Sequence, residues 1–251
     1  MKNKPSIFKA VLCFLLALAA VFALTGCKDK VEKQTAKLSG KFLSDRQVQE
    51  KFKSPEGKVA FKTDYTLPVL DEKDNHGYSE FNKIMESIES NSQSTAKTVI
   101  ANKLFEKGKP WKETGGYTVP YASYHYISVV VDIQREASSG NISEVFTPVT
   151  FSLLDGRQSS LAHFGKVSSD YLKTQLAKAI MVKISDSGAG MPELSAVRSA
   201  FELTDFVLTP TGFDIYFTNS TLSGYSGVAD FYSFTFDEVE NLLNLPNLPE
   251  D

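Results

Sequence analysis

The feature that most constrains the fold is a pair of long segments in which apolar residues alternate with other residues. The first covers residues 117–135, the second covers residues 143–153, and Ser-Ser-Gly-Asn at 138–141 separates them. A period of two predicts β-strands, and a short segment with Gly and Asn between two strands predicts a hairpin turn. Between residues 127 and 133, one side of the first segment is purely β-branched: Ile127, Val129, Val131 and Ile133. We therefore expect an antiparallel sheet around an apolar core.

The rest of the chain adds strands and helices in a clear order. Polar residues at 109–116, around the single Trp, predict a loop, and residues 186–192 predict a flexible connector. The other expected elements are a strand at 59–70, one helix at 78–105 or two with a break near 91–95, a helix at 168–185, two strands around a turn at 209–212, a strand at 228–236, and a short helix capped by Asp237. This order predicts an α+β fold with a mainly antiparallel sheet and helices packed on one side.

The N-terminus has the layout of a secretory leader. Three lysines precede an apolar run at residues 11–24, which is short for a membrane span. The run ends in Leu24-Thr25-Gly26-Cys27, which resembles the bacterial lipoprotein box. This resemblance implies that residues 1–26 are removed, that the Cys27 sulfur receives a diacylglycerol, and that its amino group is acylated with a fatty acid such as palmitate. An ordinary signal peptide with a nearby cysteine is the alternative.

The expected lipid anchor also predicts where the protein is located. We expect the protein in the cell envelope, anchored to a membrane through Cys27 and facing away from the cytoplasm. If the cell has an outer membrane, that is the expected membrane. Residues 27–57 are rich in Lys, Glu, Gln and Ser, with a short helix around residues 45–52 as one option. That composition predicts a flexible tether between the lipid and the folded domain.

Charge and cysteine content exclude several classes of function. The leader removes three of the 27 basic residues and none of the 30 acidic ones, so the mature chain is acidic and lacks a basic block for nucleic acid. Cys13 leaves with the leader, so the domain is expected to have no disulfide and no thiolate metal site. His76, His125 and His163 have no metal-ligand spacing. We expect no metal, no cofactor and no catalytic set.

Tyrosines gather in two stretches of the sequence. Four lie within residues 117–126, and Tyr225 and Tyr232 lie on either side of the last predicted turn. Tyr combines a large contact face with a polar tip, which suits binding of a protein or a glycan. Packing of aromatic side chains within the sheet is the alternative for each of them.

Several strand and turn segments carry a resemblance to a known family. They are residues 150–156, 161–164, 206–217, 225–227 and 232–239. Through them, the chain from Phe146 onward resembles a domain of bacterial envelope proteins that is found in the extracellular part of the anti-sigma-V factor, a lysozyme receptor, and in peptidoglycan deacetylases. Residues 58–145 look like the domain that commonly precedes it. The resemblance therefore implies two parts of one α+β unit, at 58–145 and 146–245.

The resemblance also implies a partner-binding loop between the last two long strands. In the lysozyme-binding member this loop carries a Pro-Tyr pair, and Asn219 and Ser220 stand at the matching positions here, with Tyr225 further along. We take Asn219, Ser220 and Tyr225 as candidate contacts to a partner. The expected function is a non-catalytic binding protein for a lysozyme-like protein or cell-wall glycan. The alternatives are a structural or assembly lipoprotein with a protein partner, and an enzyme acting on the cell wall.

Overall fold

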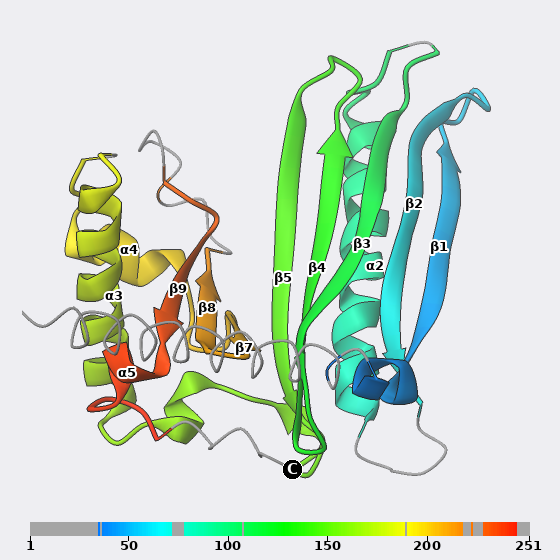
Figure 1. Cartoon of the computed structure of the whole chain (residues 1–251). Coiled ribbons are helices and arrows are strands. Elements are labelled where there is room, and N and C mark those ends of the chain that lie inside the picture. Colours follow the sequence, from blue (N-terminus) through cyan, green and yellow to red (C-terminus); the bar gives the residue numbers. More distant parts are fainter. Residues whose placement is uncertain are drawn as a thin grey trace, which may run out of the picture.

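Two β-sheets, each with its own helices, make up the described part of the chain (Figure 1). The computed structural model describes residues 35, 37–71, 78–106, 108–188, 190–217, 222 and 228–244. Nearly all strand pairs are antiparallel, which confirms the predicted α+β class with mainly antiparallel pairing. The strands divide between two sheets rather than joining one. Within the described residues, no helix is long and apolar enough to cross a membrane.

The large sheet has the strand order β1-β2-β3-β4-β5-β6. Its strands are β1 (Leu43–Lys53), β2 (Val59–Leu70), β3 (Trp111–Ala122), β4 (Tyr126–Glu136), β5 (Ile142–Ser152) and β6 (Arg157–Gln158). Helix α2 (Ser79–Ala101) connects β2 to β3 and lies along one face of the sheet (Figure 1). Its apolar side, including Phe81 and Met85, packs on Phe151 and the β-branched side of β4, so the predicted face of residues 127–133 is the core face.

The large sheet is split between β2 and β3. These two strands pair in parallel only from Phe61 with Trp111 to Tyr65 with Gly115, and then they diverge. A helical segment at residues 37–42, with buried Leu38, packs on the same core beside the gap. The Ala122 N–H, at the end of β3, donates to Thr35 Oγ1 at 3.4 Å, so the described chain begins at this end of the sheet.

The small sheet consists of three strands, covered by three α-helices. The elements are the 3₁₀ helix η2 (Leu161–Phe164), α3 (Ser169–Asp186), α4 (Leu194–Ala200), β7 (Phe206–Thr209), β8 (Gly212–Tyr216), β9 (Phe231–Thr235) and α5 (Phe236–Val239). Ser168 caps α3, as its position predicts, and α3 buries Leu172, Leu176 and Ile180 against the sheet. The predicted turn at 209–212 joins β7 to β8.

A chain of buried hydroxyl groups joins the two sheets. On the face of the large sheet away from α2, Ser128 Oγ accepts the Leu208 N–H at 3.0 Å, and Thr150 Oγ1 donates to the Phe206 carbonyl at 2.9 Å. Because Thr150 uses its single proton there, Ser128 Oγ donates to Thr150 Oγ1, at 2.8 Å. Both backbone groups lie on the side of β7 that does not face β8, so this relay satisfies a strand edge that would otherwise be unpaired.

Strand β1 corrects the expectation for the tether. The sequence predicts that residues 43–53 lie within the tether, with a short helix as one option. They form instead an edge strand that pairs with β2 along its length. Only one side of β1 faces the core, through Val48 and Phe52, while the other side carries polar residues. An edge strand with one solvent-exposed face has a composition similar to that of a polar linker, so the sequence of β1 resembles that of a tether.

Strand β3 corrects the predicted loop at 109–116. Lys, Glu and Gly are weak strand formers, but tertiary contacts fix the segment in the sheet. Glu113 is fully buried and pairs with Arg135 of β4. A Cβ at position 115 would lie 2.0 Å from the Asp132 carbonyl oxygen, so only glycine fits there. The predicted strand at 117–135 is in fact the end of β3, a turn at 123–125, and β4.

Three smaller differences concern element ends. Helix α2 is continuous through residues 91–95, so the option of a break there is wrong. Thr235, not Asp237, caps α5, through a capping box with Glu238. The expected division between residues 145 and 146 lies inside β5, so the large sheet takes strands from both expected parts.

Candidate functional site

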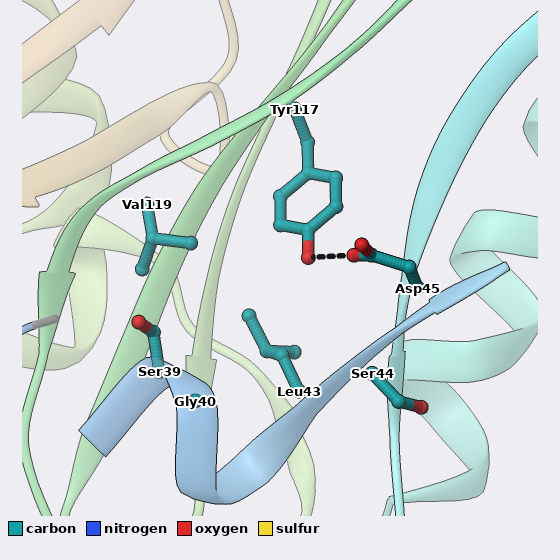
Figure 2. Close-up of a pocket in the computed structure, with 7 residues that line it drawn as sticks. All are labelled: Ser39, Gly40, Leu43, Ser44, Asp45, Tyr117 and Val119. Carbon is teal, nitrogen blue, oxygen red and sulfur yellow. Dashed lines mark hydrogen bonds between the residues drawn. The ribbon is translucent and has the colours of Figure 1, made fainter. Parts of the chain in front are cut away.

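A pocket opens at the split between β2 and β3. Its volume is about 290 Å³, which suits one small group rather than a whole extended ligand. It is lined by Ser39, Gly40, Leu43, Ser44, Asp45, Tyr117 and Val119 (Figure 2). The pocket exists because β3 leaves β2 after Gly115, and because the 37–42 segment covers one end of the resulting gap without filling it.

The Tyr117–Asp45 pair is the polar centre of this pocket. The phenol donates to Asp45 Oδ1 at 2.6 Å, across 72 positions of sequence, and Figure 2 shows the two side chains pointing at each other. Burial raises the pKa of Tyr117 to about 12, and the hydrogen bond and charge of Asp45 add to the shift. At neutral pH the phenol therefore stays protonated and acts as a hydrogen-bond donor.

The pocket offers chemistry for a ligand that carries both hydroxyl groups and an apolar side. Leu43 and Val119 supply aliphatic surface, and the half-buried Tyr117 ring supplies an aromatic face. A carboxylate has about four lone-pair sites, and the Tyr117 phenol occupies one of those on Asp45. A carboxylate, hydroxyl groups and an aromatic ring around a small apolar floor are the groups that bind a sugar ring.

The tyrosines of residues 117–126 do not form one surface. Tyr117 lines the pocket, Tyr121 is buried in the core of the small sheet, and Tyr126 packs edge-on against Phe164 at 5.6 Å. Only Tyr124 is largely exposed, on the turn between β3 and β4. For Tyr121 and Tyr126 the packing alternative is therefore correct.

The other predicted site residues lie outside the described part of the chain. This holds for Cys27, for Asn219 and Ser220, and for Tyr225. Tyr232, on the strand β9 that follows the loop with Asn219, Ser220 and Tyr225, is nearly buried. It packs against Phe217 with ring centroids 5.5 Å apart, so its role is packing.

A second feature, which we call the acidic aromatic surface, lies on β5 and on β8 and β9, the strands before and after residues 218–227. Its rings are Phe146, Tyr216 and Phe231, with centroids 5.8 Å apart for the first pair and 5.0 Å for the second. Burial raises the pKa of Tyr216 to about 12, and the charges of Asp214, Asp132 and Asp230 raise it further. Phe231 is 42% exposed, whereas Tyr216 is buried and Phe146 is partly buried.

Asp132 is repelled by two other carboxylates of this surface. Burial raises the pKa of Asp132, and the charges of Glu144 and Asp230 raise it further. Burial also raises the pKa of Asp214, although a hydrogen bond with Ser233 opposes the shift. A partner that brings positive charge would relieve this repulsion.

The histidines fill local roles where the structure describes them. His163 Nδ1 accepts the Ser160 N–H at 3.2 Å in the capping box of η2, and His125 lies exposed on the β3–β4 turn. His76 lies outside the described residues. Among the residues that are described, no group of three or more His, Cys, Asp or Glu is arranged to hold a metal ion.

Sequence reasoning missed the pocket for a physical reason. Ser39, Gly40 and Asp45 lie in the segment expected to be a tether, and Tyr117 lies 72 positions from its partner. No motif joins residues this far apart, because a parallel strand pair and its divergence bring them together. The one signal in the sequence was the density of tyrosines around position 117.

Comparisons with known proteins yield structural neighbours only. No model of a known protein family matches the sequence, and no curated protein matches it. The chain is similar to a crystal structure of a DUF3298 family member from Bacteroides fragilis, with 11% identity, a TM-score of 0.49, and coverage of 80% of this chain and 93% of the other. It is also similar to a DUF3298 family protein from Pseudomonas aeruginosa, with 9% identity, a TM-score of 0.48, and coverage of 82% and 96%. The pairing with anti-sigma-V factor and deacetylase domains stays a prediction.

Proposed function

We propose that this protein is a lipid-anchored, non-catalytic binding protein of the bacterial cell envelope, and that it holds a sugar unit of cell-wall glycan in the Tyr117–Asp45 pocket. The observation that carries the proposal is the composition of that pocket. A phenol, a carboxylate and the Ser39 side chain face a cavity of about 290 Å³ beside Leu43 and Val119 (Figure 2). The anchor is Cys27 of the lipoprotein box.

The pocket chemistry supports binding rather than turnover. Glycoside hydrolysis commonly uses two carboxyl groups on opposite sides of the scissile bond. The pocket lining supplies one, Asp45, and it already accepts a hydrogen bond from Tyr117. With a pKa of about 12, the Tyr117 phenol is also a poor general base at neutral pH.

Retention on purified peptidoglycan tests the glycan ligand. The wild-type protein should be retained, and Tyr117→Ala should weaken binding about tenfold, which corresponds to about 1.4 kcal/mol. Tyr171→Ala, which removes an exposed tyrosine on α3, is the matched control and should bind like wild type. If the wild-type protein is not retained, or if Tyr117→Ala binds unchanged, the pocket does not hold the glycan.

A second candidate is a lysozyme-like protein with a basic surface, and the acidic aromatic surface favours it. Asp132, Asp214 and Asp230 surround Tyr216 there, and the predicted contacts Asn219, Ser220 and Tyr225 follow β8 directly in the sequence. Lysozyme pull-down at increasing salt tests this candidate, because contacts between opposite charges weaken with ionic strength. Asp132→Asn combined with Asp230→Asn should lower retention. If retention changes neither with salt nor with these substitutions, the acidic aromatic surface does not bind lysozyme.

Membrane fractionation tests the anchor separately. Cys27→Ala should release the protein from membranes, since two or three acyl chains anchor a protein stably and none remain in this variant. A Cys27→Ala variant that still fractionates with membranes would show that the lipid assignment is wrong.

A further inference from the structure

Three exposed features could carry a further role: the acidic aromatic surface, the apolar residues at the far end of the large sheet, and the end where the described chain begins. We call the last of these the exit end, and define it by Lys41, Phe42, Tyr124 and Leu154. We propose that the exit end rests on the membrane that carries the Cys27 lipid, with Tyr124 and Leu154 inserted at the level of the lipid headgroups. This inference rests on the proposed lipid anchor.

The exit end combines the side chains that prefer a membrane interface. Leu154 is 70% exposed and Tyr124 is 52% exposed. Tyrosine favours the boundary between water and lipid because it has an apolar ring and a polar tip. An exposed leucine gains free energy when it leaves water for the acyl region.

Tyr124 and Leu154 lie on neighbouring turns. Tyr126 of β4 pairs with Ser152 of β5, and the Leu153 N–H donates to the His125 carbonyl at 2.8 Å. The two turns therefore end at the same level of the sheet, so a flat surface can contact both side chains at once.

A lysine lies at the same level. The Lys41 ammonium lies 5.2 Å from the ring centroids of both Phe42 and Tyr124, and those rings meet edge to face at 6.3 Å. A cation beside interfacial aromatics suits a surface of anionic lipid headgroups. Asp155 also lies on the Leu154 turn, but Ser152 Oγ donates to its carboxylate.

Exposed apolar residues alone do not indicate which end of the large sheet contacts the membrane, because both ends carry them. At the opposite end, Ile142 is 61% exposed, and Leu104 and Val145 are also exposed. The point where the chain enters the domain decides between the ends. The described chain starts at Thr35, which accepts the hydrogen bond from Ala122 at the end of β3, two residues before Tyr124.

The length of chain between Cys27 and Thr35 limits which end of the large sheet can reach the bilayer. Eight residues span at most about 28 Å when fully extended. Strand β5 has 11 residues, so the two ends of the sheet are about 35 Å apart. The link is too short to place the Ile142 end on the bilayer while Cys27 stays in it. It readily allows contact by the exit end.

Site-specific labelling of the full, lipidated chain tests the orientation. The mature sequence contains no cysteine besides Cys27, whose sulfur would be blocked by lipid, so a single introduced cysteine accepts the dye. The variants are Leu154→Cys and, as a matched control at the other end of the same sheet, Ile142→Cys. Each is labelled with an environment-sensitive dye and reconstituted into vesicles of equal parts phosphatidylglycerol and phosphatidylcholine that contain a nitroxide-bearing lipid.

The expected result is a blue-shifted dye at position 154 that the lipid nitroxide quenches several-fold more strongly than the dye at position 142. Equal quenching at both positions would indicate a side-on domain, and stronger quenching at 142 an inverted one; either overturns the inference. Fractionation of Cys27→Ala is run in parallel. If that variant is released and position 154 is still not quenched, the anchor stands and the orientation is wrong. If Cys27→Ala stays on membranes, the anchor itself fails.

Discussion

On one face of β4 and β5 lies helix α2, on the other lies strand β7 of the small sheet, and the two contacts differ in kind. The α2 face is held by apolar packing, with Phe151 of β5 against Phe81 of α2 at a ring distance of 5.5 Å. The β7 face is held in its centre by the hydroxyl relay of Ser128 and Thr150, beside a small apolar cluster that includes Val130 and Val207.

The same two strands therefore pack against a hydrophobic core on one face and position a second sheet on the other. Apolar packing is non-directional, so many side chains of similar volume would hold α2. The relay is directional, because each hydroxyl must meet one particular backbone group of β7. The α2 face therefore provides stability, and the β7 face fixes where the small sheet sits. On β5, Thr150 belongs to the contact with β7, and the next residue, Phe151, belongs to the contact with α2.

The largest expected effect comes from truncating the α2 face. Phe151→Ala removes a fully buried ring and should lower the free energy of unfolding by about 3–5 kcal/mol, measured by denaturant titration. Val145→Ala, at an exposed position on the same face of β5, should change it by no more than about 0.5 kcal/mol. Equal losses for the two variants would contradict the assignment of Phe151 to the core.

The next effect tests a buried ion pair on the α2 face. Arg135 contacts Glu113 Oε1 through both Nε and Nη2, and the Glu113 side chain is completely buried. Arg135→Met leaves that carboxylate without its partner and should cost about 3 kcal/mol in the free energy of unfolding. Adding Glu113→Gln removes the uncompensated charge and should restore part of the loss; a double variant as unstable as the single one would argue that the pair contributes packing only.

The relay on the β7 face should give a smaller and more local effect. Thr150→Val keeps the shape but leaves the Phe206 carbonyl without its donor, at a cost of about 1–3 kcal/mol. Ser128→Ala removes the acceptor of the Leu208 N–H, so exchange of that amide with deuterium should accelerate. Thr118→Val, at an exposed position on β3, is the control for both. Unchanged exchange at Leu208 would mean that the relay does not hold β7.

The smallest effect distinguishes the two faces by titration of tyrosine. Burial raises the pKa of Tyr65, on the α2 face, to about 12, and that of Tyr216, on the other side, to the same value. Unfolded tyrosine ionises near pH 10, so the stability that these phenols contribute is complete below pH 10 and is lost as pH rises through 12. Phenolate absorbance against pH measures both.

A single carboxylate should move only one of these phenols. The charge of Asp132 raises the pKa of Tyr216 and is not among the causes for Tyr65. Asp132→Asn should therefore lower the pKa of Tyr216 and leave Tyr65 unchanged. Because the pKa of Asp132 is itself raised by burial, the same variant should be slightly more stable than wild type at neutral pH. A shift of both phenols would show that the faces are not electrostatically separate.

Much of the fold was predictable because its signal is local. The alternation at 127–133 identified the core face of β4, the helical spacing after position 78 identified α2, and Ser168 marked the start of α3. Each of these depends on the period of one element or on a cap within one turn. The candidate site was not predictable, because Asp45 and Tyr117 belong to strands that are not neighbours in sequence.

The sequence by itself determined the α+β class and the order of most elements, since periodicity and turns are properties of short segments. The lipoprotein box is also a short segment, and the lipid anchor at Cys27 is the proposal that rests on it. Only the tertiary structure decided that the strands divide into two sheets, and that polar residues 43–53 form an edge strand. It also decided that β2 and β3 separate to leave a pocket. Glu113 and Gly115 illustrate the reason: neither favours a strand, but the Arg135 partner and the close Asp132 carbonyl, both distant in sequence, place them in one.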